Sequence, residues 1–272
     1  MWGIVILFIF RVGSALDPED TPGLAHFLEH MLFMGTEKYP MNDTYREFIV
    51  NNGGYCNAFT FFTNTNYHFN VCNDSFVKAL DIFSQFFICP LFDPNKVQDE
   101  MNAVNSENEK NQQSESWRFY QLFYNCAQQG STFNRFIIGN KKTLDLPGIE
   151  AQLHEFYKKW YSANIMKLCV YSNKTLDEIE QTITEKFSHI ENHQIQVPTF
   201  SFPINYPKSH LGKLIKMKTR ANINEVNFIF CLDNYQKNQF KPLDYIMHFL
   251  GHEGGSSINS LGTCVNPSQK TL

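Results

Sequence analysis

Residues 21–35 read TPGLAHFLEHMLFMG, and from Leu24 onward this stretch contains only three polar side chains. They are His26, Glu29 and His30. The i, i+3, i+4 spacing places all three on one side of an α-helix whose other sides are apolar. Burying polar groups without partners costs free energy, so partners must come from elsewhere in the chain. The stretch therefore predicts a buried helix with one polar stripe around which the fold is built.

Two histidines four residues apart on a helix can direct their imidazole rings at a single zinc ion. The competing interpretation is a pair of core histidines that hydrogen-bond to other groups. Glu29 stands between the two histidines and no other polar residue shares the helix, which favours zinc. Because Glu29 is displaced along the helix, it is placed to act as a general base.

A catalytic zinc ion needs a third protein ligand and an open fourth position. A second helix, predicted from Pro94 onward, supplies three glutamates at positions 100, 107 and 109. Its core-facing residues recur at i, i+4, i+7 and are Val97, Met101 and Val104. At about 100° per residue, Glu100 and Glu107 lie together at one margin of that apolar stripe, whereas Glu109 lies towards the far side. The helical phase favours Glu100 or Glu107 as the third ligand, and ordinary solvated carboxylates are the alternative.

Composition excludes some classes of function. The chain has 272 residues, 43% of them hydrophobic and 26 of them phenylalanine, which predicts a globular protein with wide aromatic core faces. The net charge of −4, without any long run of Lys or Arg, argues against a nucleic-acid partner. Seven scattered cysteines without a C-x-x-C pair are typical of reduced intracellular thiols, so we expect a cytoplasmic protein.

The apolar start MWGIVILFIF has two interpretations. It lacks the basic residues that begin a secretion signal, and Arg11 falls where the apolar region should already have ended. The stretch is also too short to cross a bilayer, so we expect no stable membrane span. A buried strand over Ile4 to Val12 is favoured over a secretion signal.

The remaining pattern mixes helices with strands that alternate or follow short turns, which predicts an α+β fold with a mainly antiparallel sheet. Further strands are expected at 55–62, 66–71, 165–172 and 224–233. Further helices are expected at 42–51, from 76 until Pro90 stops it, at 148–163 and at 176–190, with one more beginning near 240. The segment at 193–210 contains three prolines and marks the best boundary. We expect a zinc-binding catalytic domain at 1–211 and the start of a second, related domain at 212–272.

Several stretches together resemble one known family. HFLEH followed by SENEKN resembles the inverted zinc motif H-x-x-E-H of the inverzincins, the M16 metallopeptidases of the insulin-degrading enzyme (insulysin) family. The similarity covers roughly residues 11–260. It also includes VGSALDP (12–18), TNYHFNV (65–71), FFICPLFDP (86–94), NAVNSENEKN (102–111), SWRFYQL (116–122), FNRFIIGNKKTL (133–144) and HFLGHEGGS (248–256).

The resemblance implies roles for individual residues. His26, His30 and Glu107 would bind one zinc ion per chain, and Glu29 would be the catalytic base that activates water for attack on a peptide bond. Glu100 would be a nearby supporting carboxylate.

The resemblance also implies where a peptide substrate binds. In the family, a substrate is added as a strand to a sheet edge, which here corresponds to Asn57, Ala58, Phe59 and Thr60, and main-chain pairing of this kind tolerates many sequences. Trp117 resembles a residue near the substrate cleft, with core packing as the equal alternative.

A second histidine pair imitates the spacing of metal ligands. His248 and His252 also stand at i and i+4, but glycines place them at a fraying helix end and no third ligand is in evidence. The resemblance implies instead that this region contacts the N-terminal end of a substrate. The candidate exosite residues are Gly251, His252, Glu253 and Gly254.

The leading hypothesis is a zinc-dependent oligopeptidase of insulysin type. Family members close two halves like a clamshell, and the Arg and Tyr that the other half contributes have no counterpart in these 272 residues, so we expect weak activity or none from this chain alone. One alternative is a noncatalytic module that holds zinc and extended peptide and pairs with a complementary half or with a second copy. A mitochondrial processing subunit, the weaker alternative, shares the zinc motif but not the longer matches.

Overall fold

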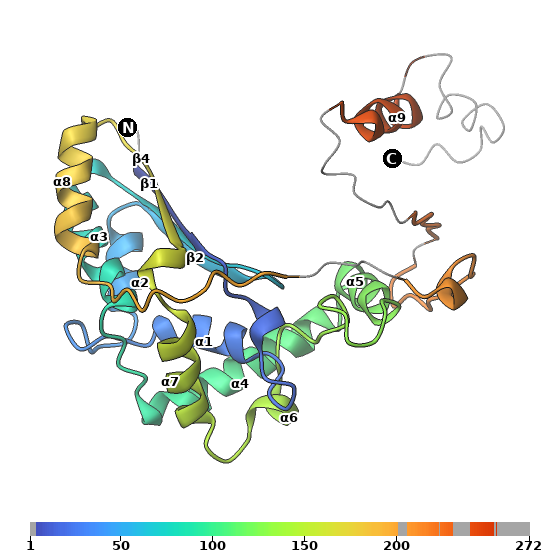
Figure 1. Cartoon of the computed structure of the whole chain (residues 1–272), viewed down its shortest axis with the longest axis horizontal. Coiled ribbons are helices and arrows are strands. Elements are labelled where there is room, and N and C mark those ends of the chain that lie inside the picture. The colour runs from blue at the N-terminus through green and yellow to red at the C-terminus, as the bar shows by residue number, and fades with distance from the viewer. Residues whose placement is uncertain (1–3, 201–205, 223, 231–239, 253, 255–272) are drawn as a thin grey trace. The chain divides into compact units, whose positions relative to one another are not determined.

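A computed structural model describes residues 4–200, 206–222, 224–230, 240–252 and 254 (Figure 1). The chain divides into two compact units, residues 1–223 and 224–272. The first unit contains a four-stranded antiparallel sheet in the order β2-β3-β1-β4. Its strands are β1 Ile4–Phe10, β2 Tyr55–Thr60, β3 Thr65–Val71 and β4 Met166–Tyr171. The predicted α+β class is confirmed.

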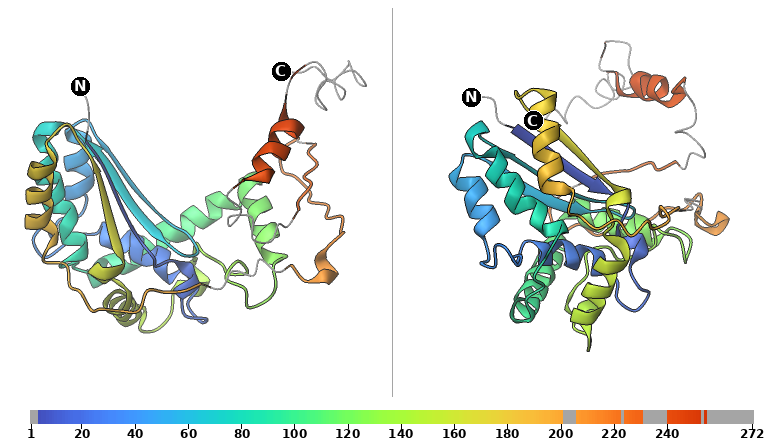
Figure 2. Two further views of the ribbon diagram at one scale, coloured as in Figure 1. Left: turned by 45° about the horizontal axis from the view of Figure 1, so that its top comes forward. Right: turned by 60° about the vertical axis from the view of Figure 1, so that its left-hand side comes forward.

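Helices surround this sheet mainly on one face (Figure 2). In the first unit they are α1 Leu24–Leu32, α2 Thr44–Asn51, α3 Phe76–Ser84, α4 Pro94–Asn111, α5 Glu115–Asn125, α6 Lys141–Leu144, α7 Ile149–Trp160 and α8 Leu176–Phe187. Short 3-10 helices lie at Ser14–Leu16, Asn73–Ser75, Gln85–Phe87, Ala163–Ile165 and Lys208–His210. The second unit contains α9, Pro242–Gly251. No helix in the described part of the chain is long and apolar enough to cross a membrane.

The apolar N-terminal stretch forms the interior strand β1, which pairs with β3 on one side and β4 on the other. Its side chains alternate: those of Ile6 and Phe8 are buried under the helices, whereas Val5 and Leu7 are 45% and 40% exposed on the opposite face. The strand prediction is therefore confirmed. The strand ends at Phe10, two residues earlier than expected, and the chain then turns into a 3-10 helix.

Aromatic rings fill the space between the sheet and the helices. Phe83 of α3 packs against Phe8 of β1 and Phe69 of β3, with ring centroids 6.0 and 5.2 Å apart. Phe86 and Phe87 extend the same cluster towards α1 and β3. Burying each such ring contributes about 1.5–3 kcal/mol, which accounts for the high phenylalanine content.

Helix α1 begins differently from the usual sequence signal. Thr21 fits the pattern of an N-cap, but the N-cap is Gly23, in a left-handed conformation with φ 96°. The carboxylate of Asp17 takes over the capping role, since it accepts hydrogen bonds of 2.8 Å from the backbone N–H groups of Gly23 and Ala25. Thr21 instead donates its hydroxyl to Gln152 of α7, 2.7 Å away. Thr21, followed by Pro22, has the local sequence signal of an N-cap, but this tertiary contact engages its hydroxyl instead.

The strand expected at 224–233 is not found over residues 224–230, which carry no strand assignment, while the remaining residues of that range lie outside the described chain. Phe228 and Phe230 are each 81% exposed. A strand requires a neighbouring strand to pair its backbone groups, and the described residues of the second unit contain none. The periodicity of the sequence alone therefore did not determine the secondary structure of residues 224–230.

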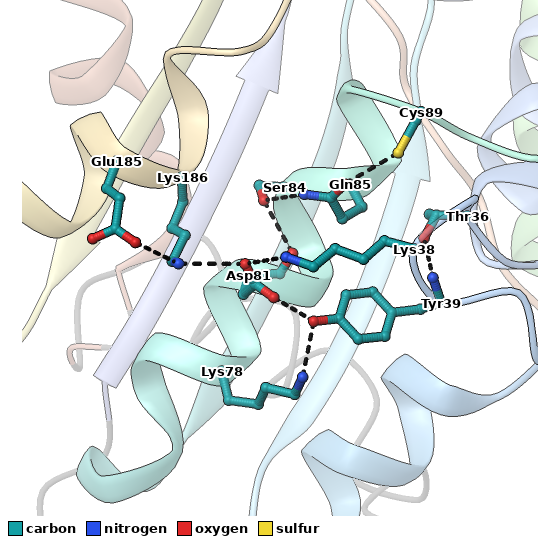
Figure 3. Close-up of polar contacts among 10 residues, drawn as sticks. All are labelled: Thr36, Lys38, Tyr39, Lys78, Asp81, Ser84, Gln85, Cys89, Glu185 and Lys186. Atoms are coloured by element: carbon teal, nitrogen blue, oxygen red, sulfur yellow. Dashed lines mark hydrogen bonds and ion pairs between the residues drawn. The ribbon is translucent and has the colours of Figure 1, made fainter.

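One carboxylate ties three elements of the first unit together (Figure 3). Asp81 on α3 forms ion pairs with Lys38, 2.9 Å away in the loop after α1, and with Lys186, 3.4 Å away on α8. It also accepts the hydroxyl proton of Tyr39, whose oxygen receives a hydrogen bond from Lys78 at 2.8 Å. Although burial acts in the opposite direction, the hydrogen bonds from Lys38 and Tyr39 and the lysine charges lower the pKa of Asp81 to about 2.

We predict that Asp81→Asn lowers the free energy of unfolding at pH 7 by roughly 1–3 kcal/mol, the usual range for losing hydrogen bonds to a charged group. Because folding lowers the pKa of Asp81 from 3.8 to about 2, its contribution is complete above pH 3.8 and lost as the pH falls through about 2. Denaturant unfolding from pH 2 to 7 measures the difference between the two proteins. Glu185→Gln, at a side chain 65% exposed, is the control. A difference independent of pH would contradict the ion-pair explanation.

Candidate metal centre

The two histidines of the polar stripe lie on α1, which is buried along nearly its whole length. Their rings meet edge to face, with centroids 4.8 Å apart. Seven of the nine residues of α1 are buried, so the helix cannot rotate the histidines towards solvent without exposing its apolar sides. The rings are therefore held beside one another by the packing of the helix.

Helix α4 supplies the acidic side of the site. Its core stripe is buried as predicted, and this orientation directs Glu107 towards both histidines. Oε2 of Glu107 lies 3.7 Å from Nε2 of His26 and 3.5 Å from Nε2 of His30. Glu109 is exposed and accepts a hydrogen bond from Asn105, away from the histidines. The margin of α4 predicted from helical phase is thus the margin that faces α1.

His26, His30 and Glu107 could together hold one metal ion. Their three donor atoms lie within 4.8 Å of one another, and no other such group of three donors occurs in the described residues. Around a tetrahedral zinc ion with bonds of about 2.0–2.1 Å, nitrogen and oxygen ligands are separated by roughly 3.3–3.5 Å. The two separations from Glu107 are close to that range. Two imidazoles and one carboxylate are also a donor set that suits zinc.

The other ring nitrogens of both histidines have partners that orient the rings. Nδ1 of His30 lies 3.1 Å from Oε2 of Glu100, whose supporting role stays a prediction. Nδ1 of His26 lies 2.7 Å from the carbonyl oxygen of Ile138, in the loop before α6. The sequence gives no sign of the Ile138 contact, because a backbone carbonyl carries no side-chain signal. Partners of this kind usually orient metal-binding histidines.

The electrostatics of the two histidines differ. Burial lowers the pKa of His26 to about 4, which keeps its ring neutral. Burial alone would also lower the pKa of His30, but hydrogen bonds to Glu100 and Glu107 outweigh it and raise the pKa to about 9. The same hydrogen bond from His30 lowers the pKa of Glu107.

Glu29 faces the sheet beside the donor group and is only 5% exposed. Burial raises its pKa to about 7, although a hydrogen bond from Thr60 acts in the opposite direction. The hydroxyl of Thr60 donates to Oε2 of Glu29 over 2.6 Å and lies 3.2 Å from the hydroxyl of Thr65. Thr60, expected among the residues that bind a substrate, therefore has its side chain directed at Glu29.

The remaining residues of the expected substrate strand lie on β2. Asn57 and Phe59 are exposed, whereas Ala58 is half-buried on the face covered by helices. β2 is an edge strand, so its outer side has no strand partner in the described sheet. Trp117 on α5 is 41% exposed, so the core-packing alternative for Trp117 is wrong. Substrate contacts of these residues remain predictions.

The candidate exosite lies at the end of α9 in the second unit. Gly251 is the last residue of α9 and His252 is its C-cap, while Gly254 follows and Glu253 lies outside the described residues. The rings of His248 and His252 are 5.5 Å apart. Among the described residues, no third donor completes a metal-binding group with this pair.

Fold and donor group define an α+β protein with a candidate mononuclear metal centre, and comparison with known proteins narrows that class. The model of the insulinase family, peptidase family M16, matches residues 5–135, and the model of the M16 inactive domain matches residues 149–261. The chain belongs to peptidase family M16, the insulinase family. The predicted domain boundary at 211/212 stays a prediction.

Named relatives are similar over nearly the whole chain. The insulin-degrading enzyme of Drosophila melanogaster is 42% identical over 93% of this chain and 27% of its own length. The human insulin-degrading enzyme is 38% identical over 92% of this chain and 25% of its own length. The chain thus spans about a quarter of the length of these curated relatives.

Solved structures agree with this assignment. The crystal structure of pitrilysin matches with a TM-score of 0.71 and 34% identity over 74% of this chain and 22% of that chain. A protease from Helicobacter pylori, 19% identical, shares the fold with a TM-score of 0.65 over 72% of this chain and 47% of its own.

We predict that the chain binds about one zinc ion, and that replacing His26, His30 or Glu107 with Ala weakens binding by more than about 100-fold. Loss of an outer partner alone typically costs 10–100-fold, and a direct ligand contributes more. Titration against a chromophoric chelator measures the affinity, and circular dichroism checks the fold. The control is His248→Ala, from the other histidine pair. If that replacement removed zinc and the first three did not, the assignment of the site would be wrong.

Proposed function

We propose that the chain is the zinc-binding part of a metalloendopeptidase that cleaves peptide bonds in short polypeptides. The observation that carries the proposal is the position of Glu29 beside a group of three metal donors that lie within 4.8 Å of one another, with Glu107 3.7 and 3.5 Å from the two histidines. Membership of the M16 family and the names of the relatives support it. The donor group fits zinc, with His26, His30 and Glu107 as its ligands.

When bound, zinc would supply Lewis acidity that makes water a stronger acid and polarises a substrate carbonyl. The residues of the chain do the rest. Glu29 accepts a proton from the attacking water and delivers it to the amine that leaves. Thr60 holds Oε2 of Glu29, which leaves Oε1 as the oxygen that receives the proton.

The edge of β2 supports the proposal that the substrate is an extended peptide. Main-chain hydrogen bonds to Asn57, Ala58 and Phe59 would hold a peptide as an added strand, and such pairing depends little on side chains. Thr60 sits at the end of this strand and contacts Glu29, so a peptide along the edge would lie close to the base. Exposed Trp117 is a candidate for a further substrate contact.

A second candidate function is a noncatalytic module that holds zinc and peptide, or that pairs with a complementary half or a second copy. The observation that favours it is the coverage of only about a quarter of the relatives' length. The activity of the full-length relatives therefore does not by itself establish activity for a polypeptide of these 272 residues. The two experiments below separate the candidates.

We predict that Glu29→Gln retains zinc but abolishes hydrolysis. The amide keeps the size of the side chain and can still bond to Thr60, yet it cannot accept a proton from water. Metal content and cleavage of quenched fluorescent peptides of about 10–30 residues are measured on the same samples, with and without chelator. Loss of zinc in parallel with activity would make Glu29 a ligand and would contradict its assignment as the base.

We predict that a polypeptide limited to these 272 residues cleaves peptides at least about 100-fold more slowly than a full-length relative. Peptide hydrolysis places negative charge on the carbonyl oxygen, and losing one donor to such an oxygen commonly costs 10²–10³ in rate. Adding a separately expressed C-terminal half of a relative should raise the rate by restoring donors and a wall that positions the peptide. Cleavage at about 10 per second by the 272 residues alone would refute this prediction.

A further inference from the structure

The loop before α6 joins the two helices that carry the metal donors. On one side the carbonyl of Ile138 contacts His26 of α1. On the other side the N–H of Lys141 donates a 3.1 Å hydrogen bond to Asn105 of α4, two residues before Glu107. Contacts between α4 and α6 continue this connection, and Figure 1 shows the two helices near one another. We call residues 138–141 the bridging segment. Its main-chain atoms connect His26 on α1 with the part of α4 that carries Glu107.

Two glycines allow the bridging segment to approach α1. A Cβ atom on Gly23 would lie 2.3 Å from the Cα and 2.5 Å from the nitrogen of Gly139, which is closer than atoms can pack. Gly23 is the N-cap of α1 and His26 follows three residues later. The absence of a side chain at Gly23 thus sets the distance at which the Ile138 carbonyl reaches the His26 ring.

Other contacts hold the segment in this position. Arg135 donates a 2.7 Å hydrogen bond to the carbonyl of Asp17, whose carboxylate caps α1. Asn140 and Thr143 form a capping box that starts α6. Leu144 is fully buried beside Gly139. The carbonyl of Ile138 is therefore fixed from both ends of the segment.

This contact determines which nitrogen of His26 carries a proton. A carbonyl oxygen can only accept, so Nδ1 of His26 must be the donor over their 2.7 Å contact. In a neutral ring the lone pair is then on Nε2. Nε2 is the atom that faces Glu107 within the donor group. The histidine is thus prepared as a ligand before any metal arrives.

We propose that the bridging segment is a positioning element for the metal centre, because it fixes the tautomer and direction of His26. The close contact between Gly23 and Gly139 holds the segment at the distance that this requires. The inference rests on the proposed function in that it takes His26 as a zinc ligand. The effect on His26 can be measured without zinc, because the tautomer is a property of the metal-free chain. Outer partners of ligand histidines typically affect metal affinity by about 10–100-fold.

The test compares two glycine replacements that differ in one respect. Gly23 and Gly148 are both helix N-caps in the left-handed region, with φ 96° and 81°, so Ala causes similar backbone strain at each. A Cβ at Gly148 meets nothing within 4 Å, whereas one at Gly23 displaces Gly139. We expect Gly23→Ala to weaken zinc binding by about 10–100-fold. Gly148→Ala should leave the zinc affinity unchanged.

Two readouts are measured on each protein: zinc affinity by chelator competition, and the His26 tautomer of the metal-free chain by long-range ¹H–¹⁵N NMR. The wild-type chain and Gly148→Ala should show the proton on Nδ1, and Gly23→Ala should show a mixture. Wild-type affinity together with an unchanged tautomer in Gly23→Ala would overturn the proposal.

A second variant guards against failure of Gly23→Ala to fold. Replacing Gly139 with glycolic acid turns the Ile138 carbonyl into an ester carbonyl, a weaker acceptor, without adding bulk. Zinc affinity should fall and the Nδ1 proton should become less favoured, and no change in either would contradict the proposal. If wild-type protein bound no zinc, the proposed function would fail. The tautomer in these variants would still decide whether the bridging segment positions His26.

Discussion

The structure depends on one constraint, which is that three polar groups must be satisfied inside an otherwise apolar helix. The apolar sides of α1 fix its burial, which buries Glu29 and holds His26 and His30 in a largely enclosed position. Removing such groups from water is unfavourable unless each receives a partner. The partners come from β2, α4 and the loop before α6, so the same requirement that stabilises the fold also assembles the candidate metal centre.

Side chains are the partners of His30, whereas a backbone carbonyl is the partner of Nδ1 of His26. Glu107 and Glu100 on α4 face His30 from two sides, and hydrogen bonds to their carboxylates raise the pKa of His30 despite its burial. His26 receives a backbone carbonyl that accepts from Nδ1, and burial lowers the pKa of its ring to about 4 although this hydrogen bond acts in the opposite direction. The pKa values of two histidines on one helix therefore shift in opposite directions, because burial dominates at His26 whereas hydrogen bonds to carboxylates outweigh burial at His30.

The sheet mainly holds residues of the candidate site in position. β1 passes through its middle and anchors β3, and β3 carries β2 as the edge strand. Pairing with β3 places Thr60 at the end of β2, opposite Thr65, where its hydroxyl reaches Glu29. The aromatic layer under the sheet and the ion pairs of Asp81 hold α3 and α8 against it. The edge proposed for peptide binding is thus supported by the most buried part of the domain.

The sequence by itself determined the α+β class, the buried helix with its polar stripe, the central strand at the N-terminus and the margin of α4 that faces the stripe. These follow from periodicity, because a repeat of 3.6 or of two fixes which residues share a face. Resemblance added Glu107 in preference to Glu100. Only the tertiary structure decided that Asp17 rather than Thr21 caps α1, that residues 224–230 form no strand, that Thr60 turns to Glu29 and that Ile138 orients His26. Each of these depends on a partner distant in the chain or on a backbone atom that every residue possesses, and neither leaves a periodic signal in the sequence.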